Sequence, residues 1–306
     1  MARPFRFGFQ ITGDHQADPV GAARRAEELG FDVVTVSDHV GPGPAPLSTL
    51  AAIAQGTDRI RLGTFVLNND MRNPVQLAWD AATIDRLSGG RFELGLGAGH
   101  TPQEYAATGI DLDQAKHRKE RLAESVEIIR QLVDGETVDH DGDHYRIEGA
   151  RIDPAHQDHL PILVGGNGAE LLGHAGAHAD IVGLQGLGRT RPDGHHHKVK
   201  WDPARLDAQI DQIRAGAGDR FERPELNALV QRVEITDDRA AALAGICDEV
   251  EGLTPDHAAA IPYLLVGTVD EIADHLVSCR ERWGISYVVV RDPDRFAPII
   301  QAVHDR

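Results

Sequence analysis

Cysteine is nearly absent from this sequence of 306 residues, which contains only Cys247 and Cys279. Both lie in segments with a helical pattern, so neither a disulfide framework nor a cysteine-based metal site is supported. Long hydrophobic runs are also missing, because no segment approaches the length of a membrane span and the first residues lack the apolar stretch of a signal peptide. We therefore expect a soluble, unprocessed protein of the reducing cytoplasm.

Basic residues are scarce relative to acidic ones, with 31 Lys and Arg against 48 Asp and Glu and a formal net charge of −17. Nucleic acids and anionic membranes bind basic surfaces, so this balance argues against both as general partners. An anionic small molecule would need local help from backbone amides or a few arginines. The hydrophobic content of 41% is nevertheless ample for a folded core.

What the sequence does contain is a regular alternation of β-rich runs and amphipathic helical segments, undivided by any linker. Strands are predicted at Phe5–Ile11, Val33–Val36, Ile60–Leu67, Arg91–Leu96, Leu160–Val164, Asp180–Leu184, Leu226–Ile235 and Ser286–Arg291. Helices are predicted at Pro19–Leu29, Leu47–Gln55, Pro74–Leu87, Leu112–Val133, Glu170–Ala177, Pro203–Ala215, Arg239–Glu251 and Val269–Trp283. Eight strands alternating with helices favour an α/β fold with one (β/α)8 TIM-barrel domain over residues 1–306, rather than two three-layer domains.

Three segments interrupt this alternation. Gly135–Ile152 has two short β-rich pieces around Asp141-Gly142-Asp143, which predicts a hairpin inserted before the fifth strand. Leu184–Trp201 is a long polar loop, and Leu253–Leu265 lengthens the connection near the seventh strand. Because loops that follow strands lie on the catalytic face of a barrel, residues 184–201 are a candidate lid.

The segment Leu160–Gly168 joins an apolar run to three glycines, and a helical pattern follows. This is typical of a buried strand, a tight turn and a helix N-terminus. Gly165, Gly166 and Gly168 would let the backbone approach a ligand, Asn167 would cap the helix, and the free amides with the helix dipole favour a phosphate. An ordinary strand–helix turn has the same pattern, so the turn alone leaves both interpretations open.

Polar or glycine-rich residues follow four predicted strands, and a barrel brings these strand ends to one rim. They are Ser37-Asp38-His39, Val66-Leu67-Asn68-Asn69, Gly97-Ala98-Gly99-His100 and Gly165–Gly168. The glycines after the fourth strand either admit a flat ligand close to the backbone or relieve crowding at a strand end. His39, beside Asp38, is a candidate acid and base because histidine exchanges protons near neutral pH. The alternative is a capping or packing histidine.

Four motifs occur in order over most of the chain: Ser37-Asp38-His39, Arg61–Leu67 followed by Arg72-Asn73-Pro74, Asp85–Arg91 leading into Leu94–Gly99, and Ile162–Gly168 followed by Ala179-Asp180. Together they resemble the luciferase-like flavin and deazaflavin oxidoreductases. The resemblance implies a (β/α)8 barrel that binds reduced FMN or coenzyme F420, a 5-deazaflavin. The ring would lie on the ends of the third and fourth strands, and the phosphate after the fifth.

In that family a non-proline cis peptide in the third strand supports the ring, and the matching bond here is Phe65–Val66. By position, the family's cofactor contacts fall on Asp38, His39, Phe65, Val66, Asn68, Ala98, Gly99, Gln103, Gly165 and Gly166. Gly97, Asn167 and Gly168 join them from the two glycine-rich turns. His100 stands where deazaflavin enzymes can carry a glutamate proton donor, which argues against a sugar-phosphate dehydrogenase closely like those relatives. His39, Asp38 and His100 are the candidate catalytic residues.

The Gly-Gly-Asn-Gly turn resembles the deazaflavin-dependent members more than the FMN monooxygenases, whose phosphate turn often bears serine or arginine. We therefore expect a coenzyme F420-dependent oxidoreductase that passes hydride between the deazaflavin and a small organic substrate, as a homodimer like its relatives. One alternative is an FMN-dependent monooxygenase that works with a separate flavin reductase, because reduced FMN activates oxygen whereas a deazaflavin passes only hydride. Another is a barrel that only carries the cofactor.

Two histidine clusters raise the question of a metal. His195-His196-His197 lies in the long polar loop, and His174 and His178 are four residues apart on a predicted helix. No carboxylate accompanies either cluster in a recognised ligand pattern, so no metal site is predicted. Arg189, Arg191 and Lys198 of the loop are instead candidates to contact the anionic tail of the cofactor.

Overall fold

Eight parallel strands close into a barrel in the computed structural model, which describes residues 3–41, 43–190 and 197–306. The barrel strands are β1 (Arg6–Ile11), β2 (Val33–Val36), β3 (Arg61–Thr64), β5 (Phe92–Gly97), β8 (Ile162–Gly165), β9 (Ile181–Leu184), β12 (Glu225–Leu229) and β15 (Ile285–Val290). β3 resumes after a break as β4 (Leu67–Asn68), and β3 and β4 both pair with β5. Because β3 at one end of the strand order also pairs with β5 near the other end, the ring is closed, and the predicted (β/α)8 barrel is confirmed.

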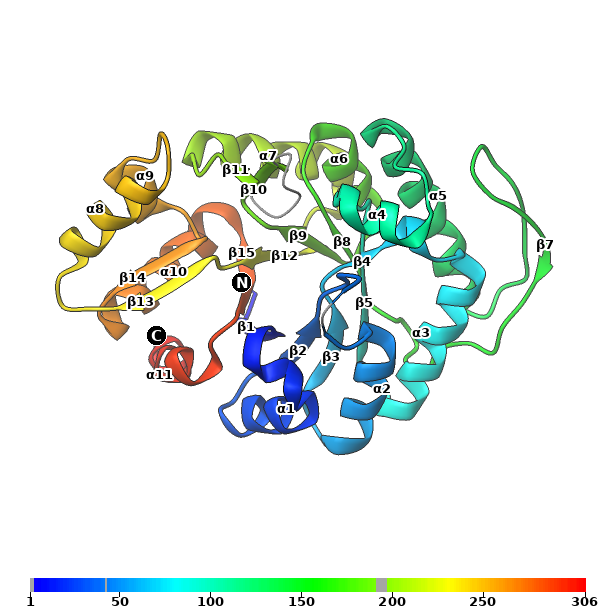
Figure 1. Ribbon diagram of the computed structural model, residues 1–306, viewed down its shortest axis with the longest axis horizontal. Coiled ribbons are helices and arrows are strands. Elements are labelled where there is room, and N and C mark those ends of the chain that lie inside the picture. Colours follow the sequence, from blue (N-terminus) through cyan, green and yellow to red (C-terminus); the bar gives the residue numbers. More distant parts are fainter. Residues whose placement is uncertain (1–2, 42, 191–196) are drawn as a thin grey trace.

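Helices surround the barrel (Figure 1). They are α1 (Pro19–Glu28), α2 (Pro46–Gly56), α3 (Pro74–Ser88), α4 (Pro102–Thr108), α5 (Ala115–Val133), α6 (Ala169–His178), α7 (Pro203–Ala217), α8 (Arg239–Glu249), α9 (Pro255–Ala260), α10 (Val269–Trp283) and α11 (Pro293–His304). Many start with proline, whose fixed φ and missing N–H suit the first helical position. Among the described residues, no helix is long and apolar enough to cross a membrane.

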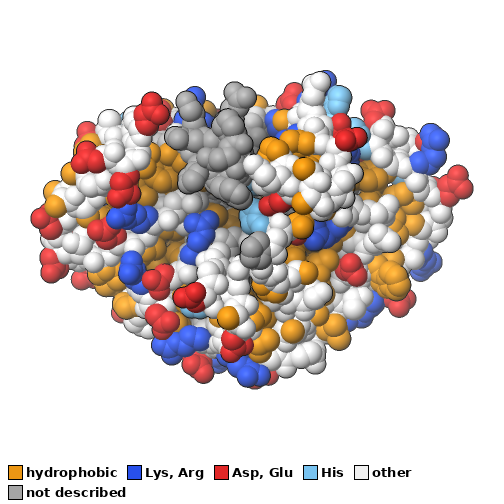
Figure 2. Space-filling model, in the orientation of Figure 1, with side chains coloured by type: hydrophobic (Ala, Val, Ile, Leu, Met, Phe, Trp, Pro, Cys, Tyr) orange, Lys and Arg blue, Asp and Glu red, His pale blue; other side chains and the backbone are white. Residues whose placement is uncertain are grey.

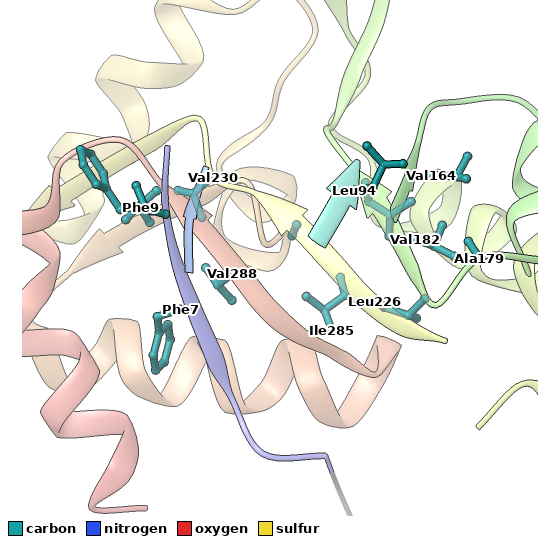
Figure 3. Close-up of a cluster of buried hydrophobic side chains, with 14 of the residues drawn as sticks. Phe7, Phe9, Leu94, Val164, Ala179, Val182, Leu226, Val230, Ile285 and Val288 are labelled. Carbon is teal, nitrogen blue, oxygen red and sulfur yellow. The ribbon is translucent and has the colours of Figure 1, made fainter. Parts of the chain in front are cut away.

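Apolar side chains cover both surfaces of the barrel wall. The interior is filled by Val33, Phe65, Leu163, Ile181, Leu229, Tyr287 and Val289. A larger core lies between the strands and the helices, and Figure 3 shows part of it, including Phe7 and Phe9 of β1, Leu226 of β12 and Val288 of β15. Both layers follow from the alternation of side chains along each strand. On the face drawn in Figure 2, acidic and basic side chains are interspersed rather than gathered by sign.

Charged residues occupy the interior at the amino ends of the strands. Arg6 of β1 pairs with Glu93 of β5 and lies 2.5 Å from Glu225 of β12. Its guanidinium is 4.6 Å from the centre of the Tyr287 ring, and Arg61 adds a second cation to Glu93. The two glutamates are almost fully buried. Arg6 therefore bridges two buried carboxylates from different strands of the barrel wall, and Arg61 completes the charge balance of the cluster.

The inserted hairpin is confirmed, since β6 (Val138–Asp141) and β7 (Arg146–Ala150) pair antiparallel. The predicted strand Leu226–Ile235 is wrong as a single strand. It divides into β12 and β13 (Arg232–Ile235), and β13 pairs with β14 (Leu264–Gly267) in a separate small sheet. The break occurs because the amide of Val230 still bonds to the β15 residue Val289, whereas that of Gln231 bonds to Tyr263.

Three helices lie beyond the predicted ones: α4, α9 and α11. In the candidate lid, β10 (Leu187–Thr190) pairs antiparallel with β11 (His197–Val199). The rest of that prediction, including Arg191, His195 and His196, lies outside the described residues, as do the side chains of Arg189, His197 and Lys198. Its role as a lid stays a prediction.

Candidate active site

The predicted strand ends do meet at one rim of the barrel. Asp38 and His39 follow β2, Asn68 ends β4, and the Gly97–His100 segment follows from β5, which pairs with both β4 and β8. Gly165 ends β8 and leads into the turn before α6. Gln103 lies on α4, directly after the β5 end, and both it and His100 are exposed.

The Phe65–Val66 peptide bond is cis, as the resemblance implies. Its carbonyl accepts a hydrogen bond from the buried side chain of Gln10, at 3.0 Å. The neighbouring strand β5 leaves room for this bulge because it has glycine at two positions. A Cβ atom on Gly95 would lie 1.9 Å from the Thr64 carbonyl oxygen, and one on Gly97 would lie 2.7 Å from Val66 Cγ2. The chain itself therefore fills the space beside these two glycines. This favours the interpretation that they relieve crowding at the strand end.

Asp38 is buried and held on both carboxylate oxygens. Arg72 pairs with it in a two-pronged contact, 3.0 Å long on the Oδ1 side. The backbone amide of Asn68 donates a further bond of 2.8 Å to Oδ2. A bidentate arginine with a backbone donor fixes a carboxylate rigidly. Asp38 therefore ties the end of β2 to the end of β4.

His39 has a carboxylate partner that the sequence did not reveal. Its Nδ1 lies 2.7 Å from Oε1 of Glu104, on α4. The side chain of His39 is 60% exposed, whereas that of Glu104 is only 11% exposed. The His100 ring stands perpendicular to that of His39, with centres 6.3 Å apart. The rim thus carries an exposed imidazole oriented by a buried carboxylate, which is a usual arrangement for a proton-transfer group.

The floor below this pair is a polar network around Tyr105 of α4. The buried Tyr105 hydroxyl donates to Asp70 at 2.9 Å and lies 3.3 Å from Asn68 Oδ1. Burial raises the pKa of Tyr105. The phenol stays protonated at neutral pH and acts as a fixed donor rather than as a base.

The glycine-rich turn has the expected strand–turn–helix form, with Gly168 at φ +102° and α6 beginning at Ala169. The predicted cap is wrong: Gly168 is the N-cap, and Asn167 instead donates to the Leu187 carbonyl at 2.7 Å and accepts from Gln209 at 3.0 Å. Asn167 therefore ties the turn to the next loop and to α7, and leaves the first amides of α6 without a side-chain cap.

A lysine from α5 lies beside this turn. Lys119 Nζ is 3.3 Å from the position that a Cβ atom would take on Gly168, and Lys119 has no ion pair within the part of the chain that the structure describes. Its neighbour Arg118 donates to the carbonyl of Ala98 at 3.2 Å, which holds α5 against the end of β5. A cation and a helix N-terminus together form a site for an anion such as phosphate.

Arg291, just after β15, faces the same rim from the other side. It donates to Gln10 Oε1 at 3.0 Å and to Gln231 Oε1 at 3.2 Å, and it has no carboxylate partner among the described residues. Burial lowers the pKa of the Arg291 guanidinium. Through Gln10, this arginine is two hydrogen bonds away from the cis peptide.

Sequence reasoning missed Glu104, Lys119 and Arg291. A signal for Glu104 was present, because Thr101-Pro102 before it is a typical helix start and Gly109 a typical helix stop. Lys119 lies inside a long predicted helix, and no local pattern relates it to a turn after the next strand. Arg291 was placed in the last strand without a role.

Comparison with known proteins identifies the family. The sequence profile of the luciferase-like monooxygenases matches residues 5–260. Among curated proteins, the F420-dependent glucose-6-phosphate dehydrogenase of Amycolatopsis mediterranei is 37% identical over 171 residues, covering 53% of this chain and 51% of that protein. The enzyme of the same name from Nocardia farcinica is 40% identical over 185 residues, covering 56% and 55%. The chain spans about half the length of the curated relatives it matches.

Solved structures share the whole fold at lower identity. An F420-dependent secondary alcohol dehydrogenase in complex with an F420-acetone adduct is 20% identical, with a TM-score of 0.79 over 98% of this chain and 99% of the other. A monooxygenase from Streptomyces bottropensis is 24% identical, with a TM-score of 0.75 over 98% of each chain. At such identity the likeness concerns the fold alone. The profile match extends from β1 to α9, and the protein belongs to the luciferase-like monooxygenase family.

Proposed function

We propose that this protein is a coenzyme F420-dependent oxidoreductase that passes hydride between the deazaflavin and a small organic molecule. The names of the curated relatives support the cofactor. The observation that carries the proposal is that the cis peptide and the glycine-rich turn adjoin: a Cβ atom on Gly165 would lie 3.0 Å from Val66 Cγ1, and Gly165 leads directly into the turn. One continuous wall thus offers a shelf for a flat ring and a site for its phosphate.

The residues at the turn fit an anionic cofactor tail. A Cβ atom on Gly166 would lie 2.3 Å from Leu171 Cδ2, so a side chain there would have to displace Leu171, and with glycine the backbone itself lines the turn. The first amides of α6 and the ammonium of Lys119 would hold the phosphate. The Phe65–Val66 peptide, with Asn68, Ala98 and Gly99 around it, would support the ring.

When bound, the deazaflavin supplies hydride chemistry, and the protein supplies position and the accompanying proton. Because an ionised carboxylate only accepts hydrogen bonds, Glu104 orients His39 so that Nδ1 carries the hydrogen and Nε2 presents its lone pair. His39 Nε2 then takes a proton from a donor alcohol or returns one to an acceptor. His100 is the second proton carrier. Asp38, held by Arg72 and the Asn68 amide, contributes to catalysis by fixing the rim beside His39.

Substitutions at His39 and Gly166 test these roles. His39→Ala should lower turnover much more than cofactor affinity, because the imidazole handles the proton and not the phosphate. Glu104→Gln should lower turnover and shift its pH profile while leaving the cofactor Kd unchanged. Gly166→Leu should do the reverse, since its side chain would collide at the turn. Equal loss of turnover and affinity in all three variants would count against the assignments.

Titration with F420 and with FMN, followed by absorbance and fluorescence, separates the cofactor alternatives. Binding of F420 with turnover of a hydride donor or acceptor supports the proposal. Tight binding of FMN without binding of F420 would overturn it in favour of a monooxygenase that needs a flavin reductase. Bound reduced F420 that every acceptor fails to oxidise, with His39→Ala changing only stability, would indicate a cofactor carrier.

We also propose a homodimer that contacts through α3. Trp79 is 61% exposed and Leu87 is 47% exposed, and their spacing puts both on one face of that helix. Leu87 also lines a cavity of about 370 Å³ between α2 and α3. A dimer that buries both side chains and covers this cavity would remove them from water. Trp79→Glu should convert the protein to a monomer in size-exclusion chromatography with light scattering, whereas Leu112→Glu, at another exposed leucine, should not.

The two free cysteines fit a reducing, cytoplasmic setting.

A further inference from the structure

Helices α5 and α6 bring together three side chains that the proposed function does not use. His174 and His178 lie one turn apart on α6, and Glu127 projects from α5. One ligand atom of each lies within 4.8 Å of the others. The two imidazole rings are stacked, with centres 4.5 Å apart and an angle of 24° between their planes. The structure therefore supplies the carboxylate whose absence from the local sequence argued against a metal.

The hydrogen bonding of His174 is incomplete in this cluster. Its Nε2 is buried and has no hydrogen-bond partner among the described residues. A buried polar atom without a partner costs free energy, and a native structure usually pairs it with a protein group, a water or an ion. His178 and Glu127 are exposed, so the cluster is open to solvent on one side. An ion can therefore enter the cluster from that side.

We propose that Glu127, His174 and His178 bind a divalent transition-metal ion of the zinc type, which links α5 to α6. Two imidazole nitrogens and one carboxylate oxygen are a common zinc ligand set, and water fills the fourth position. Ligand atoms about 2.0–2.2 Å from zinc lie roughly 3.5 Å from one another, so small rotations of the two exposed side chains complete the geometry. Mg²⁺ is a poor match because it prefers an octahedral shell of oxygens.

The site is independent of the proposed active site, since it shares no residue with it and lies among the outer helices. Its occupancy is expected to stabilise the pair of helices rather than to take part in the reaction. The metal and the proposed cofactor can therefore be tested separately, and the failure of one proposal leaves the other standing.

The test is a zinc titration of the metal-stripped full-length protein by calorimetry. We expect one Zn²⁺ per chain at this site, with the Kd raised at least about tenfold by Glu127→Gln and by His178→Ala. Saturating Zn²⁺ should raise the melting temperature of the unmodified protein by about 4 °C, and the same Zn²⁺ concentration should give at most about half of that rise in both variants. His117→Ala removes an exposed histidine from α5 and is the matched control, so it should bind zinc unchanged.

Two further measurements keep the proposal falsifiable. The visible spectrum of added Co²⁺ should show four-coordinate bands that Glu127→Gln abolishes. The triple variant His195→Ala/His196→Ala/His197→Ala accounts for zinc held by that histidine run, and it should keep the site and the rise in melting temperature. Zinc binding that survives both Glu127→Gln and His178→Ala, or that disappears with the 195–197 variant alone, would overturn the proposal. So would a Mg²⁺ effect equal to that of Zn²⁺.

Discussion

Replacing Arg6 with methionine should destabilise the protein in a way that depends on pH. Arg6 is the cation that neutralises Glu225, whose other oxygen, Oε1, has no hydrogen-bond partner among the described residues. Burial already raises the pKa of Glu225 above its ordinary value, so ionisation of this carboxyl opposes folding. Methionine has a similar apolar length but no charge, and it leaves Glu225 buried and unpaired. Glu93 keeps a cation, because Arg61 pairs with it independently.

The loss of stability caused by Arg6→Met has an upper limit, because an unpaired buried glutamate can take up a proton. Its pKa in the unfolded chain is about 4.3, and each pH unit corresponds to about 1.36 kcal/mol, so neutralising Glu225 costs at most about 3.7 kcal/mol at pH 7 and about 1 kcal/mol at pH 5. Loss of the contact between Arg6 and the Tyr287 ring adds about 1 kcal/mol at either pH. We therefore expect a loss of about 2–4 kcal/mol at pH 7 and of about 1–2 kcal/mol at pH 5.

Urea unfolding at pH 5, 6 and 7 measures this loss. The penalty is absent below the unfolded-state pKa and grows as the pH rises toward the folded-state pKa, so the Arg6→Met variant should approach the unmodified protein in acid. The double variant Arg6→Met/Glu225→Gln is the control, because it removes the titrating group and should lose the extra pH dependence. An equal loss of stability at pH 5 and pH 7, or a pH dependence that persists in the double variant, would refute the reasoning.

Three other substitutions test contacts of the rim. Gly97→Ala should cost about 1–3 kcal/mol in urea unfolding, because its Cβ would overlap Val66, and adding Val66→Ala should restore most of it; no recovery would contradict the packing argument. Arg72→Met should cost about 3 kcal/mol by stranding the buried Asp38, and a second change, Asp38→Asn, should recover part of that loss in the same assay. Lys119→Met should raise the Kd for F420 by about fivefold at low salt and by less at high salt; a salt-independent effect would argue against a phosphate contact.

The barrel was predictable because its signal is local. Each strand is a short apolar run that ends at a turn, and the alternation with helices sets the topology. The division of Leu226–Ile235 was not predictable, since both halves are apolar and β-rich. Only the tertiary structure decides that Val230 still pairs with β15 while Gln231 pairs with Tyr263. Helix α11, which covers β1 through Phe296, lay beyond the last predicted strand.

The rim of the site was predictable for a related reason: parallel strands deliver their carboxyl ends to one edge, so His39 and the glycine turn could be placed together. Their partners could not be placed, because they come from helices whose packing angles the sequence does not encode locally. Glu104 reaches His39 from α4, and Lys119 reaches the turn from α5. Asn167 shows that tertiary contacts can also override a local preference. Its residue type favours helix capping, but its side chain forms hydrogen bonds with Gln209 and the Leu187 carbonyl instead.

The pairing of β1 with β15 has a consequence for how the protein is made. Arg6 lies opposite Tyr287, so one edge of the first strand has no partner until β15 has left the ribosome. Until then any sheet that β1, β2 and β3 form has an open β1 edge, and an open edge is prone to pair with another chain. The nascent protein is therefore expected to need protection from aggregation during synthesis, and closure of the ring is a late step that depends on the last strand.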